Sequence, residues 1–182
     1  MKVAKLEDKV EIPEGITVSY DHGIYIVKGP KGEVKKIMLH PRVDVKIEGN
    51  TVVFEVKKAT KRELKIVNTY KAHMQNLFKG VAEGHIYKLK ICSGHFPMNV
   101  AVKGDLFEIN NFIGEKVPRR LKLRENTTVK IDGDNIVVES IDKEAAGQMA
   151  ASIEQLTRRP GFDKRIFQDG IYLIDKDGRP IK

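Results

Sequence analysis

The sequence is nearly devoid of cysteine and of long hydrophobic runs. Cys92 is the only cysteine among the 182 residues, which excludes an intramolecular disulfide and a thiol-based metal cluster and fits a reducing compartment. Residues 1–9 mix charges of both signs and contain no apolar run long enough for a signal peptide or a membrane span. We therefore expect a cytosolic protein that has no leader and no membrane partner.

Signatures of catalysis are also missing. The glycine-rich stretch at residues 28–32 lacks the spacing and the trailing hydroxyl residue of a P-loop, so a hairpin loop is the simpler interpretation and phosphate contact by Lys28 and Lys31 the lesser one. No serine lies in a pattern with a general base. The histidines lack metal-ligand spacing: His22, His40, His73, His85 and His95. We therefore expect no metal, no cofactor and no enzymatic activity.

What the chain does contain is an internal duplication. The segment 45–56 returns as 129–140, 84 residues later, with six of twelve positions identical. Because only two copies exist and the period is long, each copy is expected to be a small globular domain with its own core and not a turn of a solenoid. Two such globules gain contact area by lying along a large partner.

The first copy shows alternating strand patterns followed by a helical one. A hairpin is indicated at Gly49-Asn50, between the alternating segments 43–47 and 52–56. From Thr60 the apolar spacing becomes helical, and Thr60 with Glu63 fits a capping box. The expected stripe of this helix is Leu64, Val67, Tyr70, Met74 and Leu77. Gly80 ends the helix, and a strand at residues 86–91 is expected to close the copy.

The second copy follows the same course. Segments 129–131 and 136–138 form its hairpin, and a helix over 143–157 carries the stripe Ala146, Met149, Ile153 and Leu156. A strand at 171–174 matches the earlier closing strand. Because the strands precede the helix in each copy, we predict an α+β fold of two tandem related domains, 1–92 and 93–182, each an antiparallel sheet with one helix packed on one face.

The charge balance favours a polyanionic partner. The formal net charge is +8, and lysine and arginine release counterions when they bind phosphates. Residues 57–65 and 119–124 form two basic clusters, for which a solvated helix face and a loop are the plainer interpretations. Between residues 158 and 182 seven basic residues stand against four acidic ones, and only Arg158 and Arg159 are explained by the dipole of a helix C-terminus.

This C-terminal stretch also resembles a known family. The run 165–173, Arg-Ile-Phe-Gln-Asp-Gly-Ile-Tyr-Leu, followed by Lys176, resembles the C-terminal signature of the large-subunit ribosomal protein L six family in its archaeal and eukaryotic branch. Segments 68–81, 84–89 and 95–100 are similar to that family as well. With the duplication, the resemblance covers essentially the whole chain. The chain departs from the bacterial pattern, which carries Tyr-Lys-Gly-Lys-Gly near its end.

The resemblance implies a structural constituent of the large ribosomal subunit that supports translation in the cytoplasm. It implies that the C-terminal domain docks on large-subunit rRNA near the factor-binding region, by the sarcin-ricin loop and the stalk base, beside neighbouring large-subunit proteins and without homo-oligomer formation. Because no aromatic signature for single-stranded sequence is present, recognition of shape and backbone is expected. The expected rRNA-binding residues are Arg158, Arg159, Lys164, Arg165, Tyr172, Lys176, Arg179 and Lys182.

Two other classes of function remain open at this point. An RNA-processing enzyme would use Asp132, Asp134 and Asp169 as metal ligands, although Asp132 and Asp134 bracket Gly133 and a turn explains them better. A free-standing adaptor would bind acidic proteins through the basic residues 57–65. Magnesium-dependent cleavage would identify the enzyme, and sedimentation apart from the large subunit would identify the adaptor.

Overall fold

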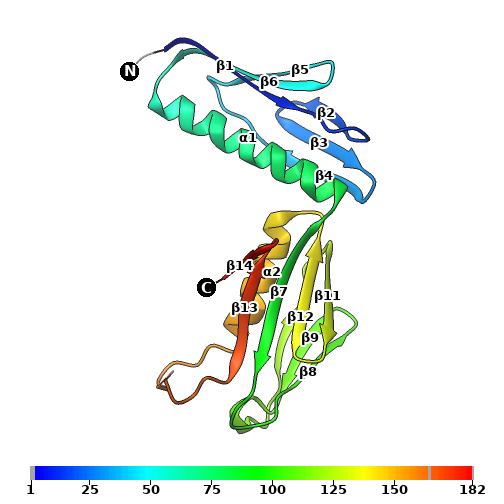
Figure 1. Ribbon diagram of the computed structural model, residues 1–182, viewed down its shortest axis with the longest axis vertical. Helices are drawn as coiled ribbons and strands as arrows, with labels where there is room; N and C mark the ends of the chain where they lie inside the picture. Colours follow the sequence, from blue (N-terminus) through cyan, green and yellow to red (C-terminus); the bar gives the residue numbers. More distant parts are fainter. Residues whose placement is uncertain (1–2, 164, 182) are drawn as a thin grey trace. The chain divides into compact units, whose positions relative to one another are not determined.

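The computed structural model describes residues 3–163 and 165–181 (Figure 1). The chain forms two compact units, Met1–Gly84 (unit 1) and His85–Lys182 (unit 2). Among the described residues, no helix is both long and apolar enough to cross a membrane.

Unit 1 is built from two antiparallel sheets and the helix α1. One sheet has the strand order β1-β6-β5 and the other the order β2-β3-β4. The bounds are β1 Val3–Glu11, β2 Thr17–Asp21, β3 Ile24–Gly29, β4 Gly32–Ile37, β5 Asp44–Glu48, β6 Thr51–Ala59 and α1 Lys61–Ala82. α1 contacts strands of both sheets, so the helix and the two sheets enclose the core of the unit (Figure 1).

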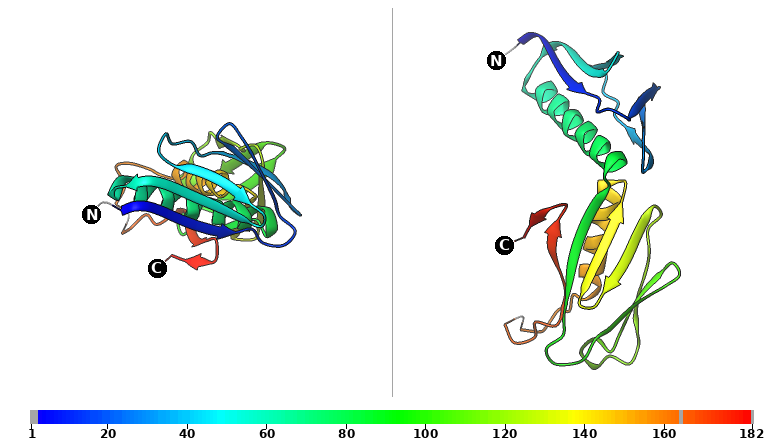
Figure 2. Two further views of the ribbon diagram at one scale, coloured as in Figure 1. Left: turned by 90° about the horizontal axis from the view of Figure 1, so that it is seen from above. Right: turned by 45° about the vertical axis from the view of Figure 1, so that its right-hand side comes forward.

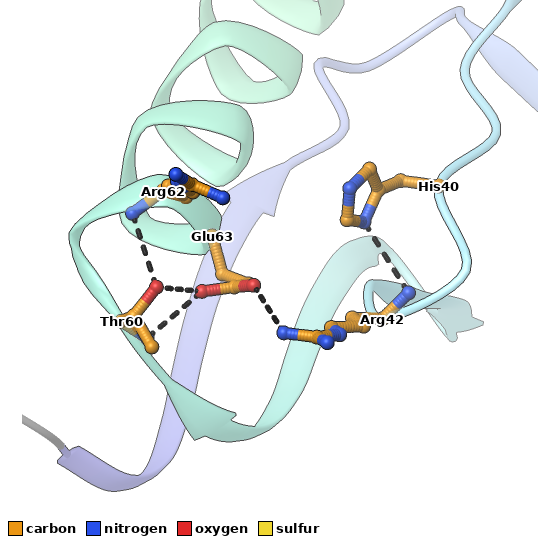
Figure 3. A network of polar contacts seen from close by, with 5 residues as sticks. All are labelled: His40, Arg42, Thr60, Arg62 and Glu63. Atoms are coloured by element: carbon orange, nitrogen blue, oxygen red, sulfur yellow. Dashed lines mark hydrogen bonds and ion pairs between the residues drawn. The ribbon is translucent and has the colours of Figure 1, made fainter.

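The start of α1 is fixed by the predicted capping box (Figure 3). The backbone N–H of Arg62 donates to the Thr60 hydroxyl oxygen at 3.3 Å, and the backbone N–H of Thr60 donates to the Glu63 carboxylate at 3.0 Å. The guanidinium of Arg42 donates to the same carboxylate at 3.1 Å. These bonds satisfy donors that the first turn of a helix otherwise leaves without partners.

One face of α1 is buried, as its periodicity predicts, but Leu64 does not belong to it. Val67, Met74 and Val81 are fully buried, and they are spaced by seven residues, or two helical turns. Leu64, which the sequence places on the stripe, is 44% exposed. In the first turn the buried position is held by Glu63, which is 3% exposed, and Leu64 points about 100° away from it around the helix.

Unit 2 contains a five-stranded sheet, a three-stranded sheet and the helix α2. The strand orders are β11-β12-β7-β13-β14 and β10-β9-β8. The bounds are β7 His85–Cys92, β8 Asn99–Lys103, β9 Leu106–Asn110, β10 Arg119–Lys122, β11 Thr127–Asp132, β12 Asn135–Ser140, β13 Gly170–Lys176, β14 Arg179–Pro180, α2 Lys143–Leu156 and a 3-10 turn at Phe112–Gly114. α2 buries Ala146, Met149 and Ile153 of its predicted stripe in a core that includes Leu89 and Ile171. The predicted α+β class is thus confirmed, with two sheets in each unit instead of one.

The duplication seen in the sequence is present in the structure. The hairpins β5–β6 and β11–β12 turn through Gly49 and Gly133, whose φ angles are 57° and 56°. Each hairpin carries the same cross-strand ion pair, Lys46 with Glu55 at 2.9 Å in the first and Lys130 with Glu139 at 3.1 Å in the second. The repeat therefore conserves the turn and the pair on the sheet face beside it.

The sheet pairing corrects one expectation from the sequence. β7 does not close the first copy, because it pairs with β12 and β13 of unit 2. It holds the place beside β12 that β1 holds beside β6, so it opens the second copy. The compact units accordingly divide between Gly84 and His85 and not at the predicted boundary after Cys92. β1 itself lies in the charged lead, where the sequence suggested no strand.

Candidate nucleic-acid interface

The end of α2 is tied to the start of β13 by a threonine. The Thr157 hydroxyl donates to the Glu154 carbonyl at 3.0 Å, and its oxygen accepts the backbone N–H of Ile171 at 3.0 Å. A Cβ at Gly170 would lie 3.3 Å from the Thr157 hydroxyl oxygen, so glycine lets the strand approach the helix end closely. The chain between residues 157 and 170 is therefore a loop held at both ends.

Arg119 of β10 braces the same helix end from the other side. It donates two hydrogen bonds of 2.7 Å to Glu115 and a third, of 2.5 Å, to the Leu156 carbonyl. Its guanidinium lies 4.4 Å from the centre of the Phe112 ring. A cation at this position satisfies a carbonyl at the C-terminus of α2 and interacts favourably with the helix dipole. The sequence placed Arg119 in a basic loop, whereas it is an internal brace.

Asp169 anchors the far end of the loop to the segment after β7. Its carboxylate accepts the backbone N–H groups of Gly94 at 2.7 Å and of His95 at 2.9 Å, and it lies 2.5 Å from Nδ1 of His95. Burial raises the pKa of Asp169, but the hydrogen bonds from His95 and Gly94 outweigh burial and leave the pKa below its ordinary value. Asp169 therefore stays ionised and acts as a structural anchor.

Aromatic rings continue from this anchor along the loop. The His95 ring lies 5.1 Å from the Phe167 ring, and Phe167 meets Phe162 at 5.0 Å with an interplanar angle of 80°. The guanidinium of Arg159 lies 4.1 Å from the centre of the Phe162 ring. The edge-to-face pair and the cation over the ring are favourable geometries. They fix the loop and hold Arg159 at its surface.

A cavity of about 300 Å³ opens between this loop, the 3-10 turn and α2. Its lining includes the rings of Phe112, Phe162, Phe167 and Tyr172 together with Arg158 and Arg159. Tyr172 is 44% exposed, and its hydroxyl donates to the Gln168 carbonyl at 3.1 Å. Burial raises the pKa of Tyr172, so the hydroxyl remains a donor at neutral pH.

The predicted binding residues fall into two groups at opposite ends of β13 (Figures 1 and 2). The loop cluster lies around the cavity and on the loop beside it: Arg158, Arg159, Arg165 and Tyr172. The turn cluster lies where β13 turns into β14: Lys176 and Arg179. With a rise of roughly 3.3 Å per residue, the length of β13 separates the groups by about 20 Å. The remaining two predicted residues, Lys164 and Lys182, lie outside the described residues.

Two cations of the loop cluster already have anionic partners: Arg159 lies 3.9 Å from Glu115, and Arg165 pairs with Asp163. Arg165 donates to Asp163 at 2.8 Å and 3.1 Å while its side chain remains 90% exposed. The hydrogen bonds from Arg165 hold the pKa of Asp163 below its ordinary range. A phosphate must displace the Asp163 carboxylate to bind Arg165, and it competes with Glu115 for Arg159, so the exposed Arg158 is the better placed donor.

The turn cluster places two like charges side by side. Lys176 and Arg179 are directly opposite each other across the β13–β14 turn, and both are exposed. Like charges in this position destabilise a strand pair. Asp177, at φ 55°, shapes the turn and lies 3.0 Å from Nδ1 of the buried His85. Asp177 thus anchors the turn to a buried side chain, while Lys176 and Arg179 face solvent. An anion bound between these two cations would reduce the repulsion between them.

The carboxylates of the alternative enzyme hypothesis do not converge. Asp132 and Asp134 flank Gly133 in the β11–β12 hairpin, while Asp169 is held by Gly94 and His95. Among the described residues no group of three metal-ligating side chains occurs. In the loop cluster, the guanidinium of Arg159 lies over the Phe162 ring.

Comparison with known proteins gives matches over both units. The family described as ribosomal protein L6 matches residues 12–84 and 96–170. The large ribosomal subunit protein uL6 of Methanococcus vannielii is 42% identical over 178 residues, which are 98% of this chain and 98% of that protein. The uL6 protein of Methanosarcina mazei is 42% identical over 174 residues, which are 96% of this chain and 99% of that protein.

Proposed function

Because the chain belongs to the ribosomal protein L6 family, we propose that it is a structural, non-catalytic component of the large ribosomal subunit and that unit 2 binds large-subunit rRNA. The proposed contact lies near the factor-binding region, by the sarcin-ricin loop and the stalk base, as the family resemblance implies. Neighbouring large-subunit proteins adjoin it there, in the cytoplasmic ribosome.

The observation that carries the proposal is the pair of anchored cation groups. The loop cluster is held by Thr157 and Asp169, and the turn cluster by Asp177. Cations on held backbone lose less conformational freedom on binding than cations on mobile chain. A span of about 20 Å between the groups exceeds the reach of a single phosphate and matches a folded RNA surface.

Binding on this account is electrostatic docking of preformed loops. Each phosphate that meets a lysine or arginine releases about one condensed counterion, so the binding constant falls steeply with salt. These contacts fix position and orientation and carry no sequence information by themselves.

The test is the salt dependence of binding to purified large-subunit rRNA. We expect the double variant Arg158→Gln with Arg159→Gln, and separately Lys176→Gln with Arg179→Gln, to lower the slope of log K against log salt by about two units each. Each pair removes two phosphate contacts. Filter binding or fluorescence anisotropy at four or more salt concentrations gives the slope.

A matched control keeps the loss of net charge constant. The double variant Lys122→Gln with Lys130→Gln removes two positive charges from β10 and β11, outside both clusters, and its slope should stay near that of the wild type. If both cluster variants keep the wild-type slope, the four substituted residues do not contact phosphates. If the wild-type protein fails to sediment with the large subunit in moderate salt, the proposal itself is wrong.

A further inference from the structure

The cavity beside the end of α2 has a size and lining that phosphate binding alone does not use. We propose that it receives one unstacked nucleobase of the bound RNA, an inference that rests on the proposed function and adds base capture to it. The cavity volume of about 300 Å³ is at the lower end of the range for small-ligand sites, so it suits a single flat ring system.

The walls of the cavity supply stacking surfaces. Phe162 and Tyr172 line it together with the guanidinium of Arg159, which lies 4.1 Å from the Phe162 ring. Proteins that bind splayed-out bases stack them on aromatic rings and on arginine planes. Phe162 is oriented by its edge-to-face contact with Phe167, and Tyr172 by its hydrogen bond to Gln168. The stacking surfaces are therefore set before any ligand arrives.

The acidic side chains at the cavity are turned inward and bound to the protein. One Glu154 carboxylate oxygen accepts the backbone N–H of Leu173 at 3.2 Å, and Asp169 accepts the N–H groups of Gly94 and His95. The exposed polar side chains in the lining are instead Gln155 and Arg158. An amide beside a guanidinium matches the edge of a base and the phosphate next to it.

A nucleotide fits this site better than a peptide side chain. Arg158 and Arg159 both line the cavity, and Arg165 lies on the adjoining loop. Glu115 and Asp163 already pair with Arg159 and Arg165, so the exposed Arg158 is the cation that meets the group following an apolar ring inserted here. In a nucleotide that group is a phosphate, whereas an apolar peptide side chain has no such charge beside it.

The site is also rigid enough to select a base. Thr157 pins α2 to β13, and Arg119 braces Phe112 on the opposite wall. Preformed walls spare the ordering cost that a mobile loop would incur on binding. The base itself must be unstacked, so the cavity favours a loop, a bulge or an end of the RNA over a paired helix.

The experiment removes the ring and keeps every charge. We expect Phe162→Ala to weaken binding of purified large-subunit rRNA about 10- to 100-fold, the range for losing one stacked base, with an unchanged slope of log K against log salt. Phe162→Tyr, which keeps a ring, should bind within about twofold of the wild type. Probing of the bases with dimethyl sulfate and with a carbodiimide, which together report all four bases, should find one base that the wild type protects and Phe162→Ala does not.

Controls separate stacking from a general loss of structure. Phe96→Ala removes a ring that is 43% exposed in unit 2 but does not line the cavity, and it should bind as the wild type does. Phe162→Leu keeps the apolar volume without a stacking ring and should match Phe162→Ala. If Phe162→Ala perturbs the NMR spectrum of unit 2 broadly, the rRNA affinity of Phe162→Leu is compared with that of the wild type instead.

The outcomes distinguish the inference from the proposed function. If the wild type binds rRNA with a steep salt slope and the Phe162 variants bind equally well, the cavity does not hold a base and the inference fails alone. If the Phe162 variants lose a contact to a neighbouring protein in the assembled subunit but keep their affinity for free rRNA, the occupant is a peptide and the inference is wrong. If the wild type does not bind rRNA, the proposed function fails first.

Discussion

The buried carboxylate of Glu63 makes the stability of unit 1 depend on acid. Glu63 is 3% exposed, and hydrogen bonds from Thr60, from backbone N–H groups and from Arg42 lower its pKa to about 2. Because the folded pKa lies below the unfolded one, the ionised carboxylate stabilises unit 1 fully above the ordinary pKa of 4.5. That contribution is lost as the pH falls from about 4.5 towards 2.

The variant Glu63→Gln tests this dependence. It should make unit 1 less stable than the wild type at pH 7, and the difference should shrink as the pH falls through the window from 4.5 to 2. Urea unfolding, followed through the NMR amide signals of α1, measures the free energy of unfolding of each protein at each pH. Glu14→Gln removes the same charge from an exposed turn and should leave the curve unchanged. A constant difference between Glu63→Gln and the wild type across the window would contradict the assignment.

At the candidate site, residue types were predictable but their grouping was not. The sequence identified Arg158, Arg159 and Tyr172 in the loop cluster and Lys176 in the turn cluster. It gave the expected rRNA-binding residues as one set, whereas β13 separates the loop cluster from the turn cluster. The cavity was not predicted, because it depends on Phe112 reaching α2 from another part of the chain. A local pattern cannot indicate such a contact.

The β3–β4 turn packs so closely on the end of α1 that only glycine fits at its first position. A Cβ on Gly29 would lie 2.8 Å from a Val81 side-chain carbon and 2.9 Å from the Val81 carbonyl oxygen. The N–H of Lys31 donates to the same carbonyl at 3.0 Å. The turn therefore satisfies a backbone group near the C-terminus of the helix, and any side chain at Gly29 would force the two apart.

Gly29→Ala should destabilise unit 1 by about 1–3 kcal/mol, the usual range for overpacking a closely packed contact. Hydrogen exchange should speed up first at the amides of the last turn of α1 and of the β3–β4 turn. Gly94→Ala is the matched control, since a Cβ there meets nothing within 4 Å, and its φ angle is not among the positive ones. Unchanged exchange in Gly29→Ala would show that the turn yields without cost.

Elements defined by neighbouring residues were predicted well, and elements defined by distant pairing were not. The capping box at Thr60 and the turns at Gly49 and Gly133 depend on a few consecutive residues, and the structure contains all three. The strand at β7 was predicted too, but its partners were not, because alternation shows which face is buried and not which strand lies beside it. The repeat period of 84 residues contained the information on pairing, because it aligns β7 with β1 and so assigns β7 to the second copy.

At the scale of the whole molecule, the second unit extends the duplicated plan. The order β11-β12-β7 repeats the order β5-β6-β1, and β13 and β14 are added beyond β7. The loop cluster lies at the start of β13 and the turn cluster at its end, so both candidate binding groups depend on the added strand. The duplicated part supplies a core, and the extension supplies the cations. If unit 2 binds rRNA as proposed, this division gives the two related units different roles.

Because β7 belongs to unit 2, its removal should prevent that unit from folding. The fragment 85–182 keeps the whole five-stranded sheet, whereas the fragment 93–182 loses the strand between β12 and β13 together with the fully buried Leu89. We expect the first fragment to give a dispersed NMR spectrum and cooperative unfolding, and the second to give neither, because two unpaired edges and an open core remain.

The complementary fragments 1–84 and 1–92 should unfold at the same temperature, since residues 85–92 pair with β12 and β13 of unit 2. Cooperative folding of 93–182 would instead show that β7 is dispensable to unit 2 and that the boundary after Cys92 is the physical one.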